Sequence, residues 1–249
     1  MNTLIRLSAF CLIVLLFALQ TAGAADAARQ PTIVLISGEY EYDSARTLPA
    51  FKQYLTTNYG FNCVYLERTK GEEIPGLEAL EKADLAIIFV RRMTLPEEQL
   101  RKIRKFIDSG KPLIGLRTAS HAFENWKEWD RDVLGGNYHN HYGNNLTATI
   151  TTRPEAAGHP ILKGVEKEFA AGGSLYLNAP LPPASAVLLM GSVTNHAPEP
   201  VAWTHDYKGA RIFYTSLGHP KDFENQSFRR LLVNAIDWAL NRPTLREVK

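Results

Sequence analysis

Hydrophobic residues follow two patterns along the first half of the chain, and the two patterns alternate. Amphipathic stretches, with apolar residues three and four positions apart, cover 45–59 and 96–109 and predict helices. Short unbroken apolar runs separate them, at 31–36, 61–66, 83–90 and 112–116. Strands that are apolar throughout are buried on both faces, so the pattern predicts a mostly parallel sheet covered by helices on both sides. The predicted fold class is a doubly wound, three-layer α/β/α domain.

The second half of the chain returns to predicted strands and closes with a helix over 226–241. The predicted strands are 146–150, 186–190, 200–204 and 210–215. No repeat, low-complexity tract or linker divides the sequence. We therefore expect one domain over 31–242.

The first 24 residues have the pattern of a secretory signal peptide. Arg6 gives the positive start, an apolar stretch follows over 9–19, and Ala22-Gly23-Ala24 forms a small-residue cleavage site. The stretch is short for a bilayer span, which needs about 20 apolar residues. We expect an exported protein, periplasmic or extracellular, and an uncleaved anchor is the alternative.

Charge excludes some partners. The 249 residues include 28 Lys and Arg against 26 Asp and Glu, a formal net charge of +2. This near-balance gives no electrostatic reason to expect nucleic acid or an anionic membrane surface. Removal of the signal peptide would leave Cys63 as the single cysteine, which excludes an intramolecular disulfide and is typical here of a small buried residue.

Titratable side chains follow the ends of five predicted strands. In a doubly wound sheet the ligand crevice lies beyond the carboxyl ends of the strands, so these side chains are expected to meet there. They are Glu39 and Glu41, Arg91 and Arg92, Arg117 and His121, His205, and His219.

Among these strand ends, the segment 115–121 is predicted to turn most sharply, because a strand there passes directly into a predicted helix. Such a turn presents a side chain beside free backbone amides, as in a nucleophile elbow. No cysteine occupies it; Thr118 and Ser120 are poor nucleophiles without a base and are more typical of helix caps. Arg117 suits a carboxylate or a polyhydroxylated ligand.

Two further features leave alternatives open. His121, His141 and His205 or His219, with Glu39 or Glu41, could hold a divalent metal such as zinc, or could be ordinary polar residues. Four aromatic residues of the glycine-rich middle segment could form a stacking wall for sugar rings or a second small core. These are Trp126, Trp129, Tyr138 and Tyr142.

Several motifs, in order, resemble the ThuA-like (trehalose-utilisation) family. They are Ser37-Gly-Glu39, Phe89-Val-Arg-Arg92, Gly115-Leu-Arg-Thr-Ala-Ser-His-Ala-Phe123, Trp129-Asp-Arg-Asp-Val-Leu-Gly-Gly136 leading to His141, and Arg211-Ile-Phe-Tyr-Thr-Ser-Leu-Gly-His219. The resemblance implies a flavodoxin-like domain of the class I glutamine-amidotransferase-like superfamily and a link to carbohydrate metabolism. Arg117-Thr118 stands where amidotransferases carry the catalytic cysteine, so glutamine hydrolysis is not expected. The pocket carried over from the resemblance is Glu39, Glu41, Arg117, His121, His141, His205 and His219.

The combined expectation is an exported enzyme that acts on a glycoside or a keto-sugar by acid–base chemistry, with a divalent metal as a possible aid. His121 would be the base or a metal ligand, Glu39 or Glu41 the partner acid, and Arg117 the group that orients the substrate. Substrate contacts are expected from Arg91, Arg92, Thr118, Trp126, Trp129, Tyr138 and His219. The alternative is a carbohydrate-binding module without catalysis, and the sequence leaves open whether the chain forms a homo-oligomer.

Overall fold

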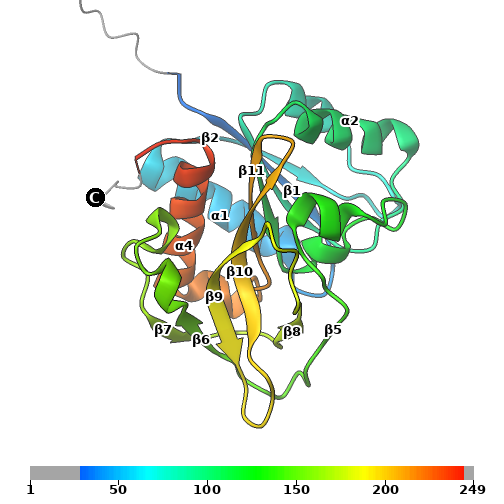
Figure 1. The fold of residues 1–249 in the computed structure, drawn as a ribbon. Helices are drawn as coiled ribbons and strands as arrows, with labels where there is room; N and C mark the ends of the chain where they lie inside the picture. The colour runs from blue at the N-terminus through cyan, green and yellow to red at the C-terminus, as the bar shows by residue number, and fades with distance from the viewer. Residues whose placement is uncertain (1–28, 244–249) are drawn as a thin grey trace, which may run out of the picture. The chain divides into compact units, whose positions relative to one another are not determined.

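The sheet of this protein is half parallel and half antiparallel (Figure 1). The computed structural model describes residues 29–243, so the predicted signal peptide lies outside the described residues. Five neighbouring strands are parallel, in the order β2 (Asn62–Glu67), β1 (Thr32–Gly38), β3 (Leu85–Val90), β4 (Leu113–Leu116) and β11 (Ala210–Thr215). This half confirms the predicted doubly wound α/β fold.

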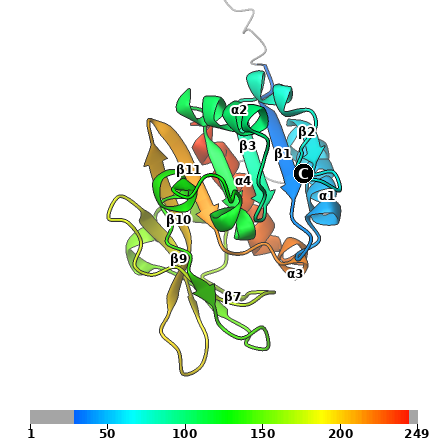
Figure 2. The ribbon, with the colours of Figure 1, turned by 90° about the vertical axis from the view of Figure 1, so that its right-hand side faces the viewer.

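Four antiparallel strands continue the sheet beyond β11. They are β10 (Glu199–Tyr207), β9 (Ala186–Ser192), β6 (Thr149–Thr152) and β7 (Glu168–Ala170). Figure 2 shows them extending away from the parallel strands. Because β10 is antiparallel to β11, its carboxyl end lies toward the edge where the parallel strands begin.

Helices cover both faces of the parallel strands. α1 (Ser44–Tyr59) and α4 (Gln226–Ala239) cover one face: α1 packs on β1, α4 packs on β4 and β11, and both share a core with Ile33 and Leu35. α2 (Glu97–Asp108) packs on the other face, against Val34 and Ile36. Alternate residues of one strand point to opposite faces, so an unbroken apolar strand supplies both cores.

Short elements complete the described fold, and those at the carboxyl ends of the parallel strands shape the site. The helical turns are η1 (Leu77–Glu81), η2 (Arg117–His121), η3 (Trp129–Leu134), η4 (Pro154–Ala156), η5 (Pro160–Leu162) and α3 (Pro220–Glu224). A separate two-stranded sheet pairs β5 (Asn140–His141) with β8 (Tyr176–Leu177). From Pro31 onward the chain forms one compact unit. Within residues 29–243 there is no helix with the length and hydropathy that a membrane crossing requires.

Candidate functional site

The backbone turns sharply directly after β4, at Arg117. This residue has φ of 45°, a left-handed conformation that is strained for a residue with a long side chain. The hydroxyl of Tyr214, on β11, donates a hydrogen bond of 2.6 Å to the Arg117 carbonyl and holds the turn. The strained strand-to-helix turn expected from the sequence is therefore present, with an arginine at its apex.

The Arg117 side chain points into the protein and is only 1% exposed. Its guanidinium carbon lies 4.0 Å from the ring centre of Tyr42 and 4.7 Å from that of Tyr176. One terminal nitrogen donates to the Ser216 carbonyl at 2.8 Å and the other to the Ser174 hydroxyl at 3.2 Å. Within residues 29–243 no carboxylate forms an ion pair with this guanidinium. Arg117 thus places a buried positive charge under the site, clamped between aromatic faces.

Gly173 provides the space for this guanidinium. A Cβ atom at position 173 would lie 2.7 Å from one terminal nitrogen of Arg117 and 2.9 Å from its central carbon. Real Cβ atoms do not approach other heavy atoms so closely, so any larger residue would push the guanidinium out of its place. The glycine is therefore part of the way the fold accommodates Arg117.

His121 ends the η2 turn and is partly exposed above Arg117. Its ring stacks on Tyr138 at a centroid distance of 4.6 Å, and its Nδ1 lies 3.0 Å from the Ser120 hydroxyl. Burial, followed by the positive charges of Arg91, Arg92 and Arg117, lowers the pKa of His121 to about 3. The imidazole is therefore neutral at neutral pH.

Arg91 and Arg92 reach the site because the chain after β3 pairs with the chain after β4. The Arg92 amide donates to the His121 carbonyl, and the Met93 amide to the Ala122 carbonyl, both at 2.8 Å. Arg92 is exposed, and the Arg91 Nε lies 2.8 Å from a Glu41 carboxylate oxygen. Three arginines thus surround one neutral histidine at the carboxyl ends of the strands.

The two glutamates after β1 have different surroundings. The Glu39 carboxylate is buried and accepts hydrogen bonds of 2.7 Å from the amides of Glu41, Tyr42 and Ser44. These bonds fix the loop that leads into α1, where free amides would otherwise lack partners. Glu41 is partly exposed and bound to Arg91, so of the two glutamates only Glu41 faces the exposed part of the cluster.

The β5–β8 pair brings His141 and Tyr176 to the same cluster. His141 is paired with Tyr176, whose ring centre lies 6.3 Å from the His141 ring and 4.5 Å from the Tyr138 ring. His219 follows β11 and lies 6.1 Å from the Tyr42 ring. It caps α3, because its Nδ1 accepts a hydrogen bond of 3.2 Å from the Lys221 amide, and burial lowers its pKa.

Other predicted site residues lie elsewhere. Trp126 and Trp129 are buried in the core on the α2 face, and the Trp129 indole nitrogen donates to the Ala119 carbonyl at 2.6 Å. These tryptophans are therefore part of the main core on that face, and their buried rings do not form a wall for sugar rings. Thr118 is fully buried inside the η2 turn. The Tyr142 ring lies 4.1 Å from the His196 ring, and its hydroxyl donates to the Ala197 carbonyl.

His205 is also placed apart from His121, which corrects the expected metal set. It pairs with Ile212 at the start of β11, and its Nδ1 lies 3.2 Å from the Ser185 hydroxyl. The sequence argument assumed that the end of its strand reaches the shared edge, but β10 runs the opposite way. In residues 29–243 no three His, Cys, Asp or Glu side chains are placed to hold a metal ion. His121, His141 and His205 therefore do not fit a zinc site.

Three further residues of the cluster were not expected from the sequence: Tyr42, Tyr176 and Asp130. The tyrosines enclose Arg117 from segments far apart in the chain. Asp130, in η3, accepts a hydrogen bond of 2.7 Å from the Tyr138 amide, while its other oxygen is buried without a partner. Burial raises the pKa of Asp130 to about 7. The Asp130 position lies inside the Trp129–Gly136 motif, which was the one signal that could have indicated it.

The fold and the cluster define a class before any relative is considered: a doubly wound α/β protein with a cationic, aromatic site at the strand ends. The family model described as trehalose utilisation, ThuA, matches residues 32–239. The chain belongs to the ThuA family. Comparison with curated proteins finds none that matches.

Solved structures share the fold at low sequence identity. One described as a ThuA-like protein from Parabacteroides merdae is 19% identical, with a TM-score of 0.70 over 88% of this chain and 93% of that one. Another, from Bacteroides uniformis, is 19% identical, with a TM-score of 0.67 over 90% of this chain and all of the other. A β-galactosidase from Rahnella sp. R3 is 14% identical, with a TM-score of 0.59 over 86% of this chain and 32% of the enzyme. At these identities the likeness concerns the fold alone.

Proposed function

We propose that this protein is an enzyme that acts on a keto-sugar, with His121 as the base. In the proposed reaction the His121 ring takes a proton from the carbon next to the sugar carbonyl, and the electron pair of that C–H bond forms an enediolate. Arg91 and Arg92 hold the negative oxygen. The observation that carries this proposal is a neutral imidazole on which the positive charges of Arg91, Arg92 and Arg117 act.

The charges around His121 support a base whose strength depends on the substrate. In the empty site burial, followed by three positive charges, keeps the ring neutral and makes it a weak base. As negative charge develops on the sugar oxygen, it offsets the arginines, and the pKa of His121 rises. The ring thus becomes basic at the moment when it must accept the proton.

The carboxylates favour this chemistry over hydrolysis of a glycoside. Glycoside hydrolysis generally uses two carboxyl groups on either side of the bond that breaks. Here the Glu39 carboxylate already accepts three backbone amides. Of the two glutamates Glu41 remains, and it is bound to Arg91, while the Asp130 carboxyl is buried and accepts the Tyr138 amide. We therefore propose the keto-sugar and assign Glu41 to the placement of Arg91.

The predicted signal peptide, which lies outside the described residues, supports a proposed reaction outside the cytoplasm. The aromatic rings of Tyr138 and Tyr176 beside His121 support a carbohydrate as the ligand, because sugar C–H faces pack on aromatic rings. The same rings support the second candidate function, a carbohydrate-binding module without catalysis.

Hydrogen exchange separates the two candidates. The purified protein is incubated in D2O with keto derivatives of glucose and trehalose, and deuterium incorporation next to the carbonyl is followed by NMR. We expect the wild-type protein to accelerate incorporation and His121→Ala to reduce the rate by about a hundredfold or more, the usual contribution of a general base. His139→Ala, which removes an exposed imidazole from the neighbouring loop, is the matched control and should exchange at the wild-type rate.

The opposite results are equally clear. Binding of a keto-sugar without any accelerated exchange would support the binding module and contradict the enzyme. Exchange that is equally fast in wild-type protein and His121→Ala would show that His121 is not the base.

A further inference from the structure

Tyr40 is the exception to the burial of large hydrophobic side chains. It is 69% exposed, and among residues 29–243 no other large hydrophobic side chain is classed as exposed. Exposed aromatic rings usually stay mobile, since nothing offsets the entropy of fixing them. The surroundings of Tyr40 are therefore informative, because they fix this ring in place.

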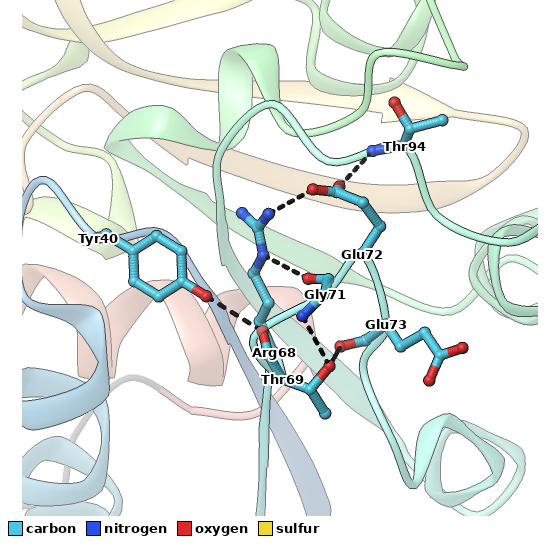
Figure 3. Close-up of polar contacts among 7 residues, drawn as sticks. All are labelled: Tyr40, Arg68, Thr69, Gly71, Glu72, Glu73 and Thr94. Carbon is cyan, nitrogen blue, oxygen red and sulfur yellow. Dashed lines mark hydrogen bonds and ion pairs between the residues drawn. The ribbon is translucent and has the colours of Figure 1, made fainter.

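The hydroxyl of Tyr40 is held by a hydrogen bond, which Figure 3 shows, and its ring lies against a cation. The hydroxyl donates to the Thr69 carbonyl at 3.1 Å. The Arg68 guanidinium lies over the ring, with its carbon 5.0 Å from the ring centre. Since one face rests on Arg68 and the hydroxyl is already bonded, what Tyr40 offers to solvent is its other face.

Arg68 is itself fixed by the neighbouring loops (Figure 3). Its Nε donates to the Gly71 carbonyl at 3.0 Å, and a terminal nitrogen lies 2.5 Å from a Glu72 oxygen. The other Glu72 oxygen accepts the Thr94 amide at 2.8 Å. The loops after β1, β2 and β3 are thereby joined beneath Tyr40. A ring held in this way loses little freedom when a ligand binds.

The position of Tyr40 connects it to the His121 cluster. The next residue, Glu41, is bound to Arg91, one of the charges that act on His121. Tyr42 lies on Arg117. A chain of two residues spans at most about 7 Å, so the backbone of Tyr40 lies close to that of Tyr42.

We propose that Tyr40 is a stacking platform for a second pyranose ring, so that the site takes a disaccharide with one ring at His121 and the other on Tyr40. A protein partner would need a broad apolar patch, and no other large hydrophobic side chain in the described residues is exposed. A single flat ring, followed in the chain by the charged Glu41 and its ion pair with Arg91, suits the apolar face and hydroxyl rim of one sugar unit. This inference rests on the proposed function, because it extends the same site.

Calorimetry with a disaccharide and its monosaccharide tests the inference. The probes are trehalose and glucose and the keto derivatives of both. We expect wild-type protein to bind the disaccharide of a pair more tightly than the monosaccharide. Tyr40→Ala should weaken binding of the disaccharide about tenfold, which corresponds to about 1.4 kcal/mol. Binding of the monosaccharide should stay within about twofold of wild type. Tyr40→Phe keeps the ring and should stay close to wild type.

Tyr207→Ala is the matched control, because this tyrosine also lies beside a cation, Lys208, but at the far end of β10. It should bind both sugars like the wild-type protein. The Tyr40 platform is wrong if Tyr40→Ala weakens binding of both sugars equally or of neither. It is also wrong if wild-type protein does not bind the disaccharide more tightly than the monosaccharide. In these cases the proposed function stands. If wild type binds none of the four sugars, both are contradicted.

Discussion

At the scale of single residues, two buried ionisable groups show how the fold sets protonation around the site. Burial and three arginines lower the pKa of His121. Burial raises the pKa of Asp130, and the hydrogen bond from the Tyr138 amide offsets only part of that effect. Burial is the leading cause for both side chains: it favours the neutral form, which lowers the pKa of the imidazole and raises the pKa of the carboxyl group.

Asp130 predicts a pH dependence of stability. Its pKa is about 7 in the folded chain, above its ordinary value of about 3.8. Between these values the folded chain retains a proton that the unfolded chain has released, so rising pH lowers the free energy of unfolding. Asp130→Asn stays neutral and keeps an acceptor for the Tyr138 amide. We expect this variant to gain stability over wild type as the pH rises from 4 to 7, by at most about 4 kcal/mol.

Urea unfolding at a series of pH values measures this difference. The gain should vanish near pH 4 and stay constant above pH 7.5. A difference between Asp130→Asn and wild type that does not change with pH would show that Asp130 is ionised throughout this range.

The sequence located part of the site at this scale. Arg91, Arg92, Arg117 and His121 come together as expected, because strand ends in a parallel sheet share an edge. Tyr42 and Tyr176 could not be found in the same way, since only folding brings their segments to Arg117. The hydrogen bonds that backbone amides donate to the Glu39 carboxylate depend on the conformation of one loop, which no residue pattern shows.

At the scale of elements, the start of α1 depends on Glu39. α1 has no side-chain cap at its first residue, and the Glu39 carboxylate instead binds the amides of the loop that enters it. Glu39→Gln keeps the shape of the side chain but loses its charge, so we expect a loss of stability of about 1–3 kcal/mol. Thermal unfolding checks this.

The same variant separates structure from chemistry. Under conditions where Glu39→Gln is fully folded, we expect deuterium exchange into a keto-sugar at close to the wild-type rate. If folded Glu39→Gln lost this exchange as completely as His121→Ala, Glu39 would belong to the reacting groups and the present assignment of His121 and Glu41 would need revision.

Elements with a local signal were predicted closely. The helix predicted over 45–59 is α1, Ser44–Tyr59, and the helix over 96–109 is α2, Glu97–Asp108. The strand predicted over 146–150 lies over Thr149–Thr152, slightly later in the chain. The direction of β10 had no local signal, because it depends on pairing with distant strands, and it moved His205 away from the site.

At the scale of the whole described unit, the parallel half of the main sheet and the separate β5–β8 pair provide the site. The parallel strands end at the Arg91, Arg117 and His121 positions, and the β5–β8 pair adds His141 and Tyr176. The ThuA family assignment agrees with this arrangement, since the matched range covers both halves. The site therefore depends on segments drawn from nearly the whole domain.

The most direct test of this account is the protonation state of the His121 ring. NMR measures it through the chemical shift of the ring proton on the carbon between the two nitrogens. We predict a signal that stays at its neutral position from pH 8 to pH 5, because the pKa of His121 is about 3. Addition of a keto-sugar should move the signal, with that of His139 unchanged. A His121 ring that titrates near pH 6.5, the ordinary value for histidine, and does not respond to any keto-sugar would contradict the account.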